Sequence, residues 1–360
     1  MAYEVDFLAV GDGGRSGDAI AVRFGDFSDP LKQWVVVIDG GFADTGDALV
    51  EHIKTYYNAN FVDLVISTHP DADHSAGLYV MLEQMKVGML WMHQPWKHTD
   101  GISEMFRDGR VTDDGVEEKL RKALDDALDL EKLARRRGVP IYEPFTGLSA
   151  FDGRVLIAGP TQKFYESLLP DFRCTPEAKR RSQLLSLLKA LTEKAGAMAE
   201  SLGIETLRDE GDPTSAENNS SAIVLIRPSP ATGLLFTGDA GIPALTEAAD
   251  HLDACGIGAS FPMFIQVPHH GSRRNVGPTI LNRLVGPKLS QDTTIKTAFV
   301  SAAKDGAPKH PAKKVTNAFR RRGAPVHATQ GEAKCYRSLD APDRGWGTST
   351  PLPLYTEVDE

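Results

Sequence analysis

Cysteine is scarce in this sequence, and its few cysteines are not arranged as a disulfide framework or a metal motif. The 360 residues contain three of them, Cys174, Cys255 and Cys335, which form no C-x-x-C pair. Structural disulfides persist mainly in oxidising compartments, where cysteines come in even sets at regular spacings. We therefore expect small buried thiols in a cytoplasmic protein.

Long apolar runs and an excess of basic residues are missing as well. No stretch approaches the roughly 18 apolar residues that a membrane helix needs, and no charged start followed by an apolar run predicts a signal peptide. The net charge is -9. This acidity argues against a protein that coats nucleic acid, since such proteins are usually basic. It leaves a nuclease open, because bound divalent cations can offset the acidity at one site.

Short apolar segments bounded by turn residues indicate strands in both halves of the chain. We predict strands at 5–10, 18–24, 34–38, 62–67, 88–92, 154–158, 222–226, 233–237, 263–267 and 297–301. Amphipathic patterns predict helices at 45–57, 76–86, 243–254, 277–285 and 311–322. Strands interleaved with helices indicate two sheets that are covered on the outside by helices.

Residues 100–215 differ in character from the rest. The ranges 115–137 and 181–203 are charged and rich in Ala and Leu, which predicts helices, and residues 209–219 are typical of a loop. We interpret 100–215 largely as a helical insertion or lid within one domain that spans residues 1–360.

Four residues of metal-ligand type follow the predicted strand 62–67 within a six-residue segment. They are His69, Asp71, Asp73 and His74. Strand ends are where α/β proteins place ligand groups, and imidazoles and carboxylates suit Zn²⁺, Mn²⁺ or Fe. A helix would spread these side chains around its circumference, so we expect a tight loop that points them into one space.

Two further strands end in residues of the same kind. The apolar run 234–236 leads to Asp239, and the run 264–267 leads to His269 and His270. A single strand followed by Gly-Asp is also typical of an ordinary turn. Taken with the first cluster, the three strand ends predict ligands that meet at one point.

These motifs make the chain resemble the metallo-β-lactamase superfamily, and within it the competence branch, the soluble hydrolase domain of ComEC-type DNA-uptake proteins. Eight blocks occur in the order of that branch: 7–11, 17–20, 38–41, 68–74, 218–221, 237–240, 269–272 and 310–311. The resemblance implies an α/β fold, the four-layer αββα metallo-β-lactamase sandwich, with a helical insertion beside the mouth of a metal site.

The resemblance also implies roles for individual residues. It assigns metal ligation to His69, Asp71, Asp73, His74, Asp239 and His270. Among these, Asp239 is the bridging carboxylate. In phosphodiester hydrolysis, Asp73 would also take part in catalysis by orienting the nucleophile. His310 is implied as an active-site histidine that binds metal or moves a proton. We expect three residues to support the ligands from behind, namely Asp39, Ser272 and His269, with His269 the second choice as a ligand.

Two departures from the superfamily's commonest pattern bear on the metal. Asp71 stands where most members have His, and this harder, anionic ligand makes Mn²⁺ a stronger rival to Zn²⁺. The chain also has no His between His98 and His251, where many relatives supply a further ligand. We expect one or two ions of Zn²⁺ or Mn²⁺, with one position weakly held.

The predicted site favours hydrolysis by a metal-activated water, with a phosphodiester in nucleic acid or a nucleotide as the first candidate substrate. His310 would protonate the leaving oxygen. The predicted substrate-binding residues are Arg273, Arg274, Lys304 and Asn219, of which the bases would clamp phosphate. An ester, thioester or lactone hydrolase is an alternative, because the same water attacks carbonyls. A metal-stabilised binding or regulatory protein is another. We expect no membrane partner, and the sequence predicts no oligomeric state.

Overall fold

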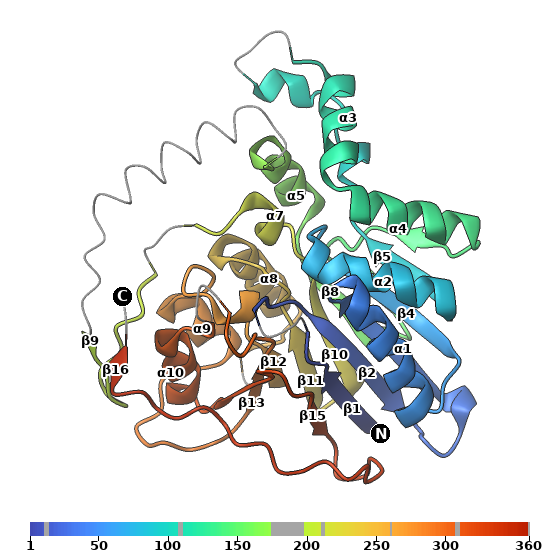
Figure 1. The fold of residues 1–360 in the computed structure, drawn as a ribbon. Helices are drawn as coiled ribbons and strands as arrows, with labels where there is room; N and C mark the ends of the chain where they lie inside the picture. Colours follow the sequence, from blue (N-terminus) through green and yellow to red (C-terminus); the bar gives the residue numbers. More distant parts are fainter. Residues whose placement is uncertain are drawn as a thin grey trace.

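Two large sheets lie face to face in this chain, with helices on both outer sides (Figure 1). The computed structural model describes residues 1–10, 14–106, 111–173, 198–209, 213–259, 261–306 and 310–358. A small third sheet pairs β9 (Met198–Ala199) with β16 (Glu357–Val358), so that the C-terminal part of the chain lies beside residues near 200.

The first sheet has seven strands. In spatial order they are β15 (Lys334–Arg337), β1 (Ala2–Phe7), β2 (Ala19–Gly25), β3 (Gln33–Gly40), β4 (Phe61–Ser67), β5 (Lys86–Met92) and β6 (Ile141–Tyr142). Strands β3 to β6 run parallel. Parallel neighbours need a crossover between them, and helices supply it on the outer face.

The second sheet also has seven strands. In spatial order they are β14 (Val326–Ala328), β13 (Thr297–Val300), β12 (Pro262–Gln266), β11 (Thr232–Phe236), β10 (Ile223–Ser229), β8 (Val155–Gly159) and β7 (Ser149–Ala150). Strands β11 to β14 run parallel. Their carboxyl ends therefore lie at one edge of the sheet.

Helices cover the outer face of each sheet. The α-helices are α1 (Ala43–Tyr56), α2 (Ala72–Gln84), α3 (Asp113–Ala123), α4 (Asp125–Arg136), α5 (Gln162–Leu168), α7 (Ala216–Asn219), α8 (Ile242–Ala254), α9 (Pro278–Leu284) and α10 (Lys313–Arg321). The short 3-10 helices are η1 (Pro30–Lys32), η2 (Pro95–Lys97), η3 (Ile102–Met105), η4 (Leu169–Asp171) and η5 (His269–Gly271). None of the described helices combines the length and apolarity that a membrane-crossing segment needs.

The core is built from strands whose two faces are both buried. On β3, Val36 and Ile38 point into the layer between the sheets, whereas Val35 and Val37 pack against α1 and α2. Strand β10 alternates in the same way against α8 and α9. Side chains alternate between faces with period two, so a strand covered on both sides has a continuous apolar sequence. The predicted four-layer αββα sandwich is thus confirmed.

Most predicted elements are present, with three corrections. α2 begins at Ala72 rather than at residue 76. Part of the predicted loop 209–219 is helix α7. Of the predicted helix 181–203, residues 181–197 lie outside the described residues, while Met198–Ala199 form strand β9. The sequence analysis also missed β6, β7, β14, β15 and β16, and its predicted helix 115–137 is divided into α3 and α4.

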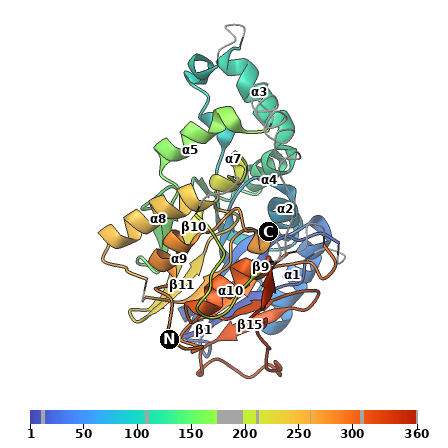
Figure 2. The ribbon, with the colours of Figure 1, turned by 90° about the vertical axis from the view of Figure 1, so that its left-hand side faces the viewer.

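Part of the predicted insertion 100–215 belongs to the two large sheets. Strands β6, β7 and β8 all fall within it and extend both sheets. Helices α3 and α5 extend beyond the sheets, as Figures 1 and 2 both show. His98 binds α5 to the body of the protein, because its two ring nitrogens each lie 3.0 Å from a carboxylate, one of Glu166 and one of Glu143.

Candidate metal centre

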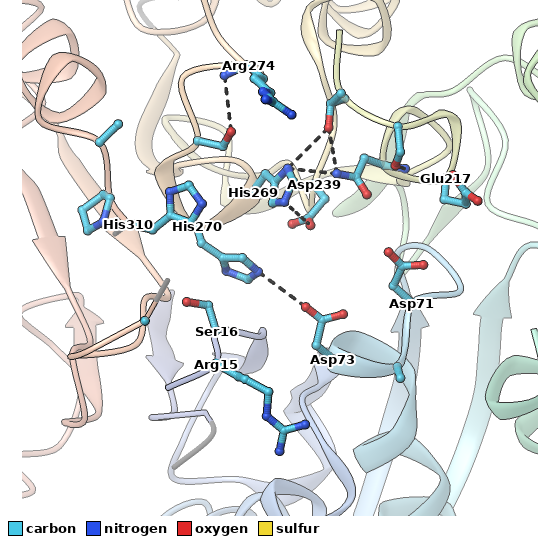
Figure 3. A pocket seen from close by; sticks show the side chains of 18 of the residues that line it. Arg15, Ser16, Asp71, Asp73, Glu217, Asp239, His269, His270, Arg274 and His310 are labelled. Carbon is cyan, nitrogen blue, oxygen red and sulfur yellow. Dashed lines mark hydrogen bonds and ion pairs between the residues drawn. The ribbon is translucent and has the colours of Figure 1, made fainter. Parts of the chain in front are cut away.

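The predicted ligands come from several strand ends that meet between the two sheets (Figure 3). β4 leads to the segment 69–74, β11 leads to Asp239, and β12 leads to η5 with His269 and His270. In parallel sheets each helix returns the chain to the same starting edge, so successive strands deliver their carboxyl ends together. Residues far apart in the sequence therefore share one site.

The first motif is not the tight loop that the sequence predicted. Asp71 is the N-cap residue of α2, and Asp73 and His74 lie in its first turn. The backbone N–H groups of His74 and Ser75 both donate to the carbonyl of Asp71 at 3.0 Å. Consecutive helical residues diverge by about 100°. This divergence buries His74 completely and leaves Asp73 lining a cavity.

Four residues form what we call the first ligand group: His69, Asp71, Asp239 and His269. Nε2 of His69 lies 3.8 Å from Oδ2 of Asp71 and 3.8 Å from Oδ2 of Asp239. Nε2 of His269 lies 3.6 Å from the same Asp239 oxygen. His69 and Asp239 therefore connect the four side chains through pairs of ligand atoms that lie 3.6–3.8 Å apart.

The other oxygen of Asp239 faces a second ligand group: His74, Asp73, His270 and Asp239 itself. Nε2 of His74 lies 3.6 Å from Oδ1 of Asp239 and 3.9 Å from Oδ2 of Asp73. Nε2 of His270 lies 3.7 Å from that Asp73 oxygen. Asp239 therefore contributes one oxygen to each group, as a carboxylate that bridges two cations would.

The ligand atoms are close together without being hydrogen-bonded to each other. Nε2 of His69, His74 and His270 and Oδ1 of Asp239 are buried and have no hydrogen-bond partner among the described residues. An unpaired buried polar atom costs about 1–3 kcal/mol, so such atoms are rare. Ligands about 2.1 Å from a tetrahedral ion are about 3.4 Å apart, close to the observed spacings. The donor types of both groups suit divalent cations, and the ligand atoms of Asp73, His74 and His270 in the second group all lie within 4.8 Å of one another.

A buried hydrogen-bond network orients two of these histidines, His69 and His74. Asp39 accepts hydrogen bonds from Nδ1 of His74 at 2.8 Å, from the Thr68 backbone N–H at 2.8 Å and from the Thr68 hydroxyl at 2.6 Å. The Thr68 hydroxyl accepts in turn from Nδ1 of His69 at 3.0 Å. Because Nδ1 carries the proton in this arrangement, Nε2 of both rings keeps its lone pair free for a ligand. Asp39 thus contacts His74 directly and His69 through Thr68.

The histidine pair after β12 has an unusual backbone. His269, His270 and Gly271 have φ of 46°, 53° and 84°, in the left-handed region that residues with side chains seldom occupy. Nδ1 of His270 donates to the Ser301 carbonyl at 3.0 Å. Nδ1 of His269 contacts the side-chain amides of Asn218 and Asn275 at 2.9 and 3.1 Å. Strain of this kind clusters at functional sites.

This backbone corrects the ranking of the two histidines. The sequence analysis placed His270 among the ligands and His269 behind it. In the structure both rings present Nε2 to a carboxylate, at 3.6 Å and 3.7 Å. The turn directs the two side chains to different ligand groups, so His269 belongs with the candidate ligands.

Burial and mutual charge set the protonation of the cluster. Burial lowers the pKa of His69 to about 3. Burial also disfavours charge on His270, but the Asp239 and Asp73 carboxylates outweigh it and raise the pKa of His270 to about 9. Although burial raises the pKa of Asp239, the neighbouring histidines hold it well below its usual value. Anionic carboxylates that gather protons onto imidazoles form a site where cations can replace those protons.

The cluster opens into a cavity of about 1300 Å³, whose floor includes Asp71, Asp73, Asp239, His269 and His270. Arg273 and Arg274, the predicted phosphate-binding residues, also line this cavity, and so does Ser272. The Ser272 hydroxyl accepts a hydrogen bond from the Arg274 backbone N–H at 3.3 Å.

Three basic residues that the sequence analysis missed also line the cavity: Arg15, Arg173 and Lys313. The cationic groups of Arg15 and Lys313 lie over aromatic rings, 4.3 Å from the Phe42 centroid and 5.5 Å from the Tyr355 centroid respectively. Cations held in this way are pre-positioned for an anionic ligand.

Two predicted substrate-binding residues are absent from the lining that the described residues form. Lys304 is exposed to solvent outside the cavity. Asn219 is buried, where its amide donates to the Ser215 carbonyl and its oxygen accepts from the Gly241 N–H, both at 3.2 Å. These bonds tie α7 to the turn before α8. The structure therefore corrects both predictions.

His310 lines the cavity beside the first ligand group, with its ring centroid 6.3 Å from that of His269. Burial, together with the charges of His270 and His269, lowers its pKa to about 4. A neutral imidazole at pH 7 suits proton acceptance or metal binding. It does not suit the predicted donation of a proton to a leaving oxygen.

Asp18 is a buried carboxylate at the site that the sequence analysis did not single out. Its Oδ2 accepts a hydrogen bond from Nε2 of Gln266 at 2.9 Å and lies 3.9 Å from Nδ1 of His74. Burial raises its pKa to about 6. Its place in the resemblance block 17–20 was the only signal that could have identified it.

No family model and no curated protein matches this chain. Several solved structures are similar to it, among them the following two. A proposed metallo-beta-lactamase from Thermotoga maritima is 12% identical, with a TM-score of 0.34 over 71% of this chain and 93% of its own. A mutant of the CmlA beta-hydroxylase is 11% identical, with a TM-score of 0.44 over 93% of this chain and 54% of its own, so this chain spans about half its length. What this chain does must therefore follow from its own residues.

Proposed function

We propose that this chain is a metal-dependent hydrolase of the metallo-β-lactamase superfamily, and that it cleaves phosphodiesters. One observation carries the proposal: two ligand groups share Asp239, and their buried ring nitrogens have no hydrogen-bond partner among the described residues. The order of the motifs along the chain supports the superfamily and its ComEC-type competence branch.

The first position would be held by the first ligand group and the second position by the second. His269 would take the place of the ligand that the sequence lacks between His98 and His251. Zn²⁺ and Mn²⁺ both suit this set, and its share of carboxylates favours Mn²⁺. Asp39 and Thr68 keep His69 and His74 aimed from behind.

Divalent cations in such a pair lower the pKa of a coordinated water and neutralise charge on a phosphate. The protein supplies orientation and proton transfer. Asp73 lines the cavity and can accept a hydrogen bond from the attacking water. His310 also lines the cavity, where its neutral ring can accept a proton.

The basic residues of the wall favour an anionic substrate. Arg273, Arg274, Arg15 and Lys313 line the cavity from three separate segments of the chain. Guanidinium groups bind phosphate oxygens in a bidentate manner. The volume of about 1300 Å³ exceeds the roughly 300–1,000 Å³ of small-molecule sites, which suits a nucleotide or a nucleic-acid strand. An ester, thioester or lactone would need the metal centre but not these cations.

The test is turnover by chelated protein that is reloaded with Mn²⁺ or Zn²⁺. Substrates are bis-nitrophenyl phosphate, single-stranded DNA, RNA, a cyclic dinucleotide and nitrophenyl acetate. We expect metal-dependent cleavage of a phosphodiester, which Asp239→Asn abolishes. The double variant Arg273→Gln/Arg274→Gln should lose phosphodiester cleavage and keep ester cleavage.

The matched control is Arg135→Gln/Arg136→Gln, which removes the same charge at the end of α4, outside the cavity lining. It should retain full activity. Cleavage of esters alone would refute the phosphodiester assignment. Bound metal without turnover of any substrate would favour a metal-stabilised binding protein.

A further inference from the structure

Arg173 reaches the metal centre from the segment that follows α5 and η4. Its backbone N–H and its Nε both donate to Oε1 of Glu217, at 2.6 and 3.0 Å. Its Nη2 forms an ion pair with Oδ1 of Asp71. One guanidinium group thus bridges a buried carboxylate of α7 and a carboxylate of the first ligand group.

The contact with Glu217 holds Arg173 in place. The Arg173 side chain is 65% exposed, whereas that of Glu217 is 2% exposed. A buried carboxylate is costly unless it is paired and hydrogen-bonded. Withdrawal of Arg173 would leave Glu217 buried without these bonds. The bridge is therefore more firmly held than an exposed ion pair would be.

The contact with Asp71 determines which of its oxygens faces the ligand group. Oδ1 binds Arg173, while Oδ2 lies 3.8 Å from Nε2 of His69. Asp71 is thereby turned so that a single oxygen points at the first position. The guanidinium also compensates the negative charge that a carboxylate adds where a histidine would be neutral.

The second ligand group is arranged differently. Its Asp73 faces the side-chain nitrogens of His74 and His270, both members of the group itself. A change at Arg173 should therefore affect one position and spare the other.

We infer that Arg173 is a positioning residue for the first metal position, which it serves by fixing Asp71 as a single-oxygen ligand and compensating its charge. Loading of that position then depends on the docking of the segment around residues 162–173 against α7. This inference rests on the metal centre of the proposed function and assigns a residue to it that the sequence motifs do not contain.

The experiment is calorimetric titration of chelated protein with Mn²⁺ and with Zn²⁺, with elemental analysis after dialysis. In the unchanged chain we expect two ions. Arg173→Gln and Glu217→Gln should each weaken one ion about 10- to 100-fold, the range known for residues that support metal ligands. The other ion should keep its affinity within about twofold. Arg121→Gln is the control, because it removes an arginine from an i,i+4 pair with Glu117 on α3.

A second background separates positioning from general damage to the fold. In Asp71→His the ligand is neutral and needs no guanidinium, so adding Arg173→Gln should change the affinity less than about twofold. Thermal unfolding of the chelated variants reports on folding independently of metal.

Equal weakening of both ions, or the same loss in the Asp71→His background, would overturn the inference. Two ions bound with unchanged affinity by Arg173→Gln would overturn it as well, while leaving the proposed function intact. No metal binding by the unchanged chain would instead refute the proposed function, and this inference with it.

Discussion

Replacing Asp39 by Asn tests whether the hydrogen bonds of Asp39 hold the candidate metal ligands in place. The side chain is fully buried and accepts three hydrogen bonds, two from Thr68 and one from His74. An amide has one acceptor oxygen. In its better orientation it keeps the two bonds at the Oδ2 position, and its NH₂ then faces the Thr68 backbone N–H.

The magnitude follows from these bonds. Loss of a charged acceptor that leaves an N–H buried costs about 1.5–3 kcal/mol. The two remaining bonds lose charge assistance, which roughly doubles the strength of such bonds. We expect Asp39→Asn to lower the free energy of unfolding of the chelated protein by about 3 kcal/mol. Since Nδ1 of His74 is then held less firmly, metal affinity should also fall about 10- to 100-fold.

Urea unfolding followed by circular dichroism measures the first quantity, and calorimetry measures the second. Asp63→Asn is the matched control. Its Oδ2 accepts a hydrogen bond from the Val35 N–H at 2.8 Å, and an amide oxygen can take that place, so we expect a loss below about 1 kcal/mol. If Asp39→Asn lost no more stability than this control and bound metal normally, the supporting role of Asp39 would be refuted.

Three further predictions concern other parts of the molecule. Two neighbouring carboxylates overcome burial and raise the pKa of His98, so the stability that His98 adds to the fold is complete below about pH 6 and is lost as the pH rises through its folded-state pKa. The free energy of urea unfolding of His98→Gln should therefore differ most from that of the unchanged chain near pH 6, and a difference that grew towards pH 9 would contradict this. Gly271→Ala places a Cβ 2.4 Å from that of Pro311, whereas the Cβ of Gly138→Ala, also at positive φ, has no neighbour within 4 Å. Thermal unfolding should show that Gly271→Ala loses more stability than Gly138→Ala, by at least about 1 kcal/mol, and equal losses of stability would mean that the crowding at Pro311 is relieved. Chelation should lower the melting temperature, because an ion at 100 times its Kd adds about 2.7 kcal/mol, and an unchanged melting temperature would speak against a filled centre.

The local sequence was sufficient to predict the layers of the fold. Residues 35–38 are apolar throughout because β3 is buried on both faces, and the same holds for β10. Helices between such strands can only return over the outer faces, which leads to the αββα sandwich. The segment from His69 to His74 marked the metal centre for a similar reason: its donors are few residues apart, so a strand end suffices to gather them.

What the local pattern could not decide depends on which segments lie side by side. The sequence offered His269 and His270 as neighbours, and only the left-handed turn sends one to each ligand group. Arg173 and Glu217 are 44 residues apart and belong to no motif, yet they meet at Asp71. Lys304 lies close to His310 in the sequence, but its side chain is exposed to solvent outside the cavity lining.

The physical reason is one of range. Periodicity and spacing report on the burial of an element and on contacts within a few residues. The partners of a metal ligand are chosen by packing across the two sheets, where a charge or a hydrogen bond acts only over a few ångströms. The sequence therefore determined that this chain is an αββα protein with a cluster of residues of metal-ligand type. The tertiary structure decided which of those side chains lie close together and which residues hydrogen-bond to them.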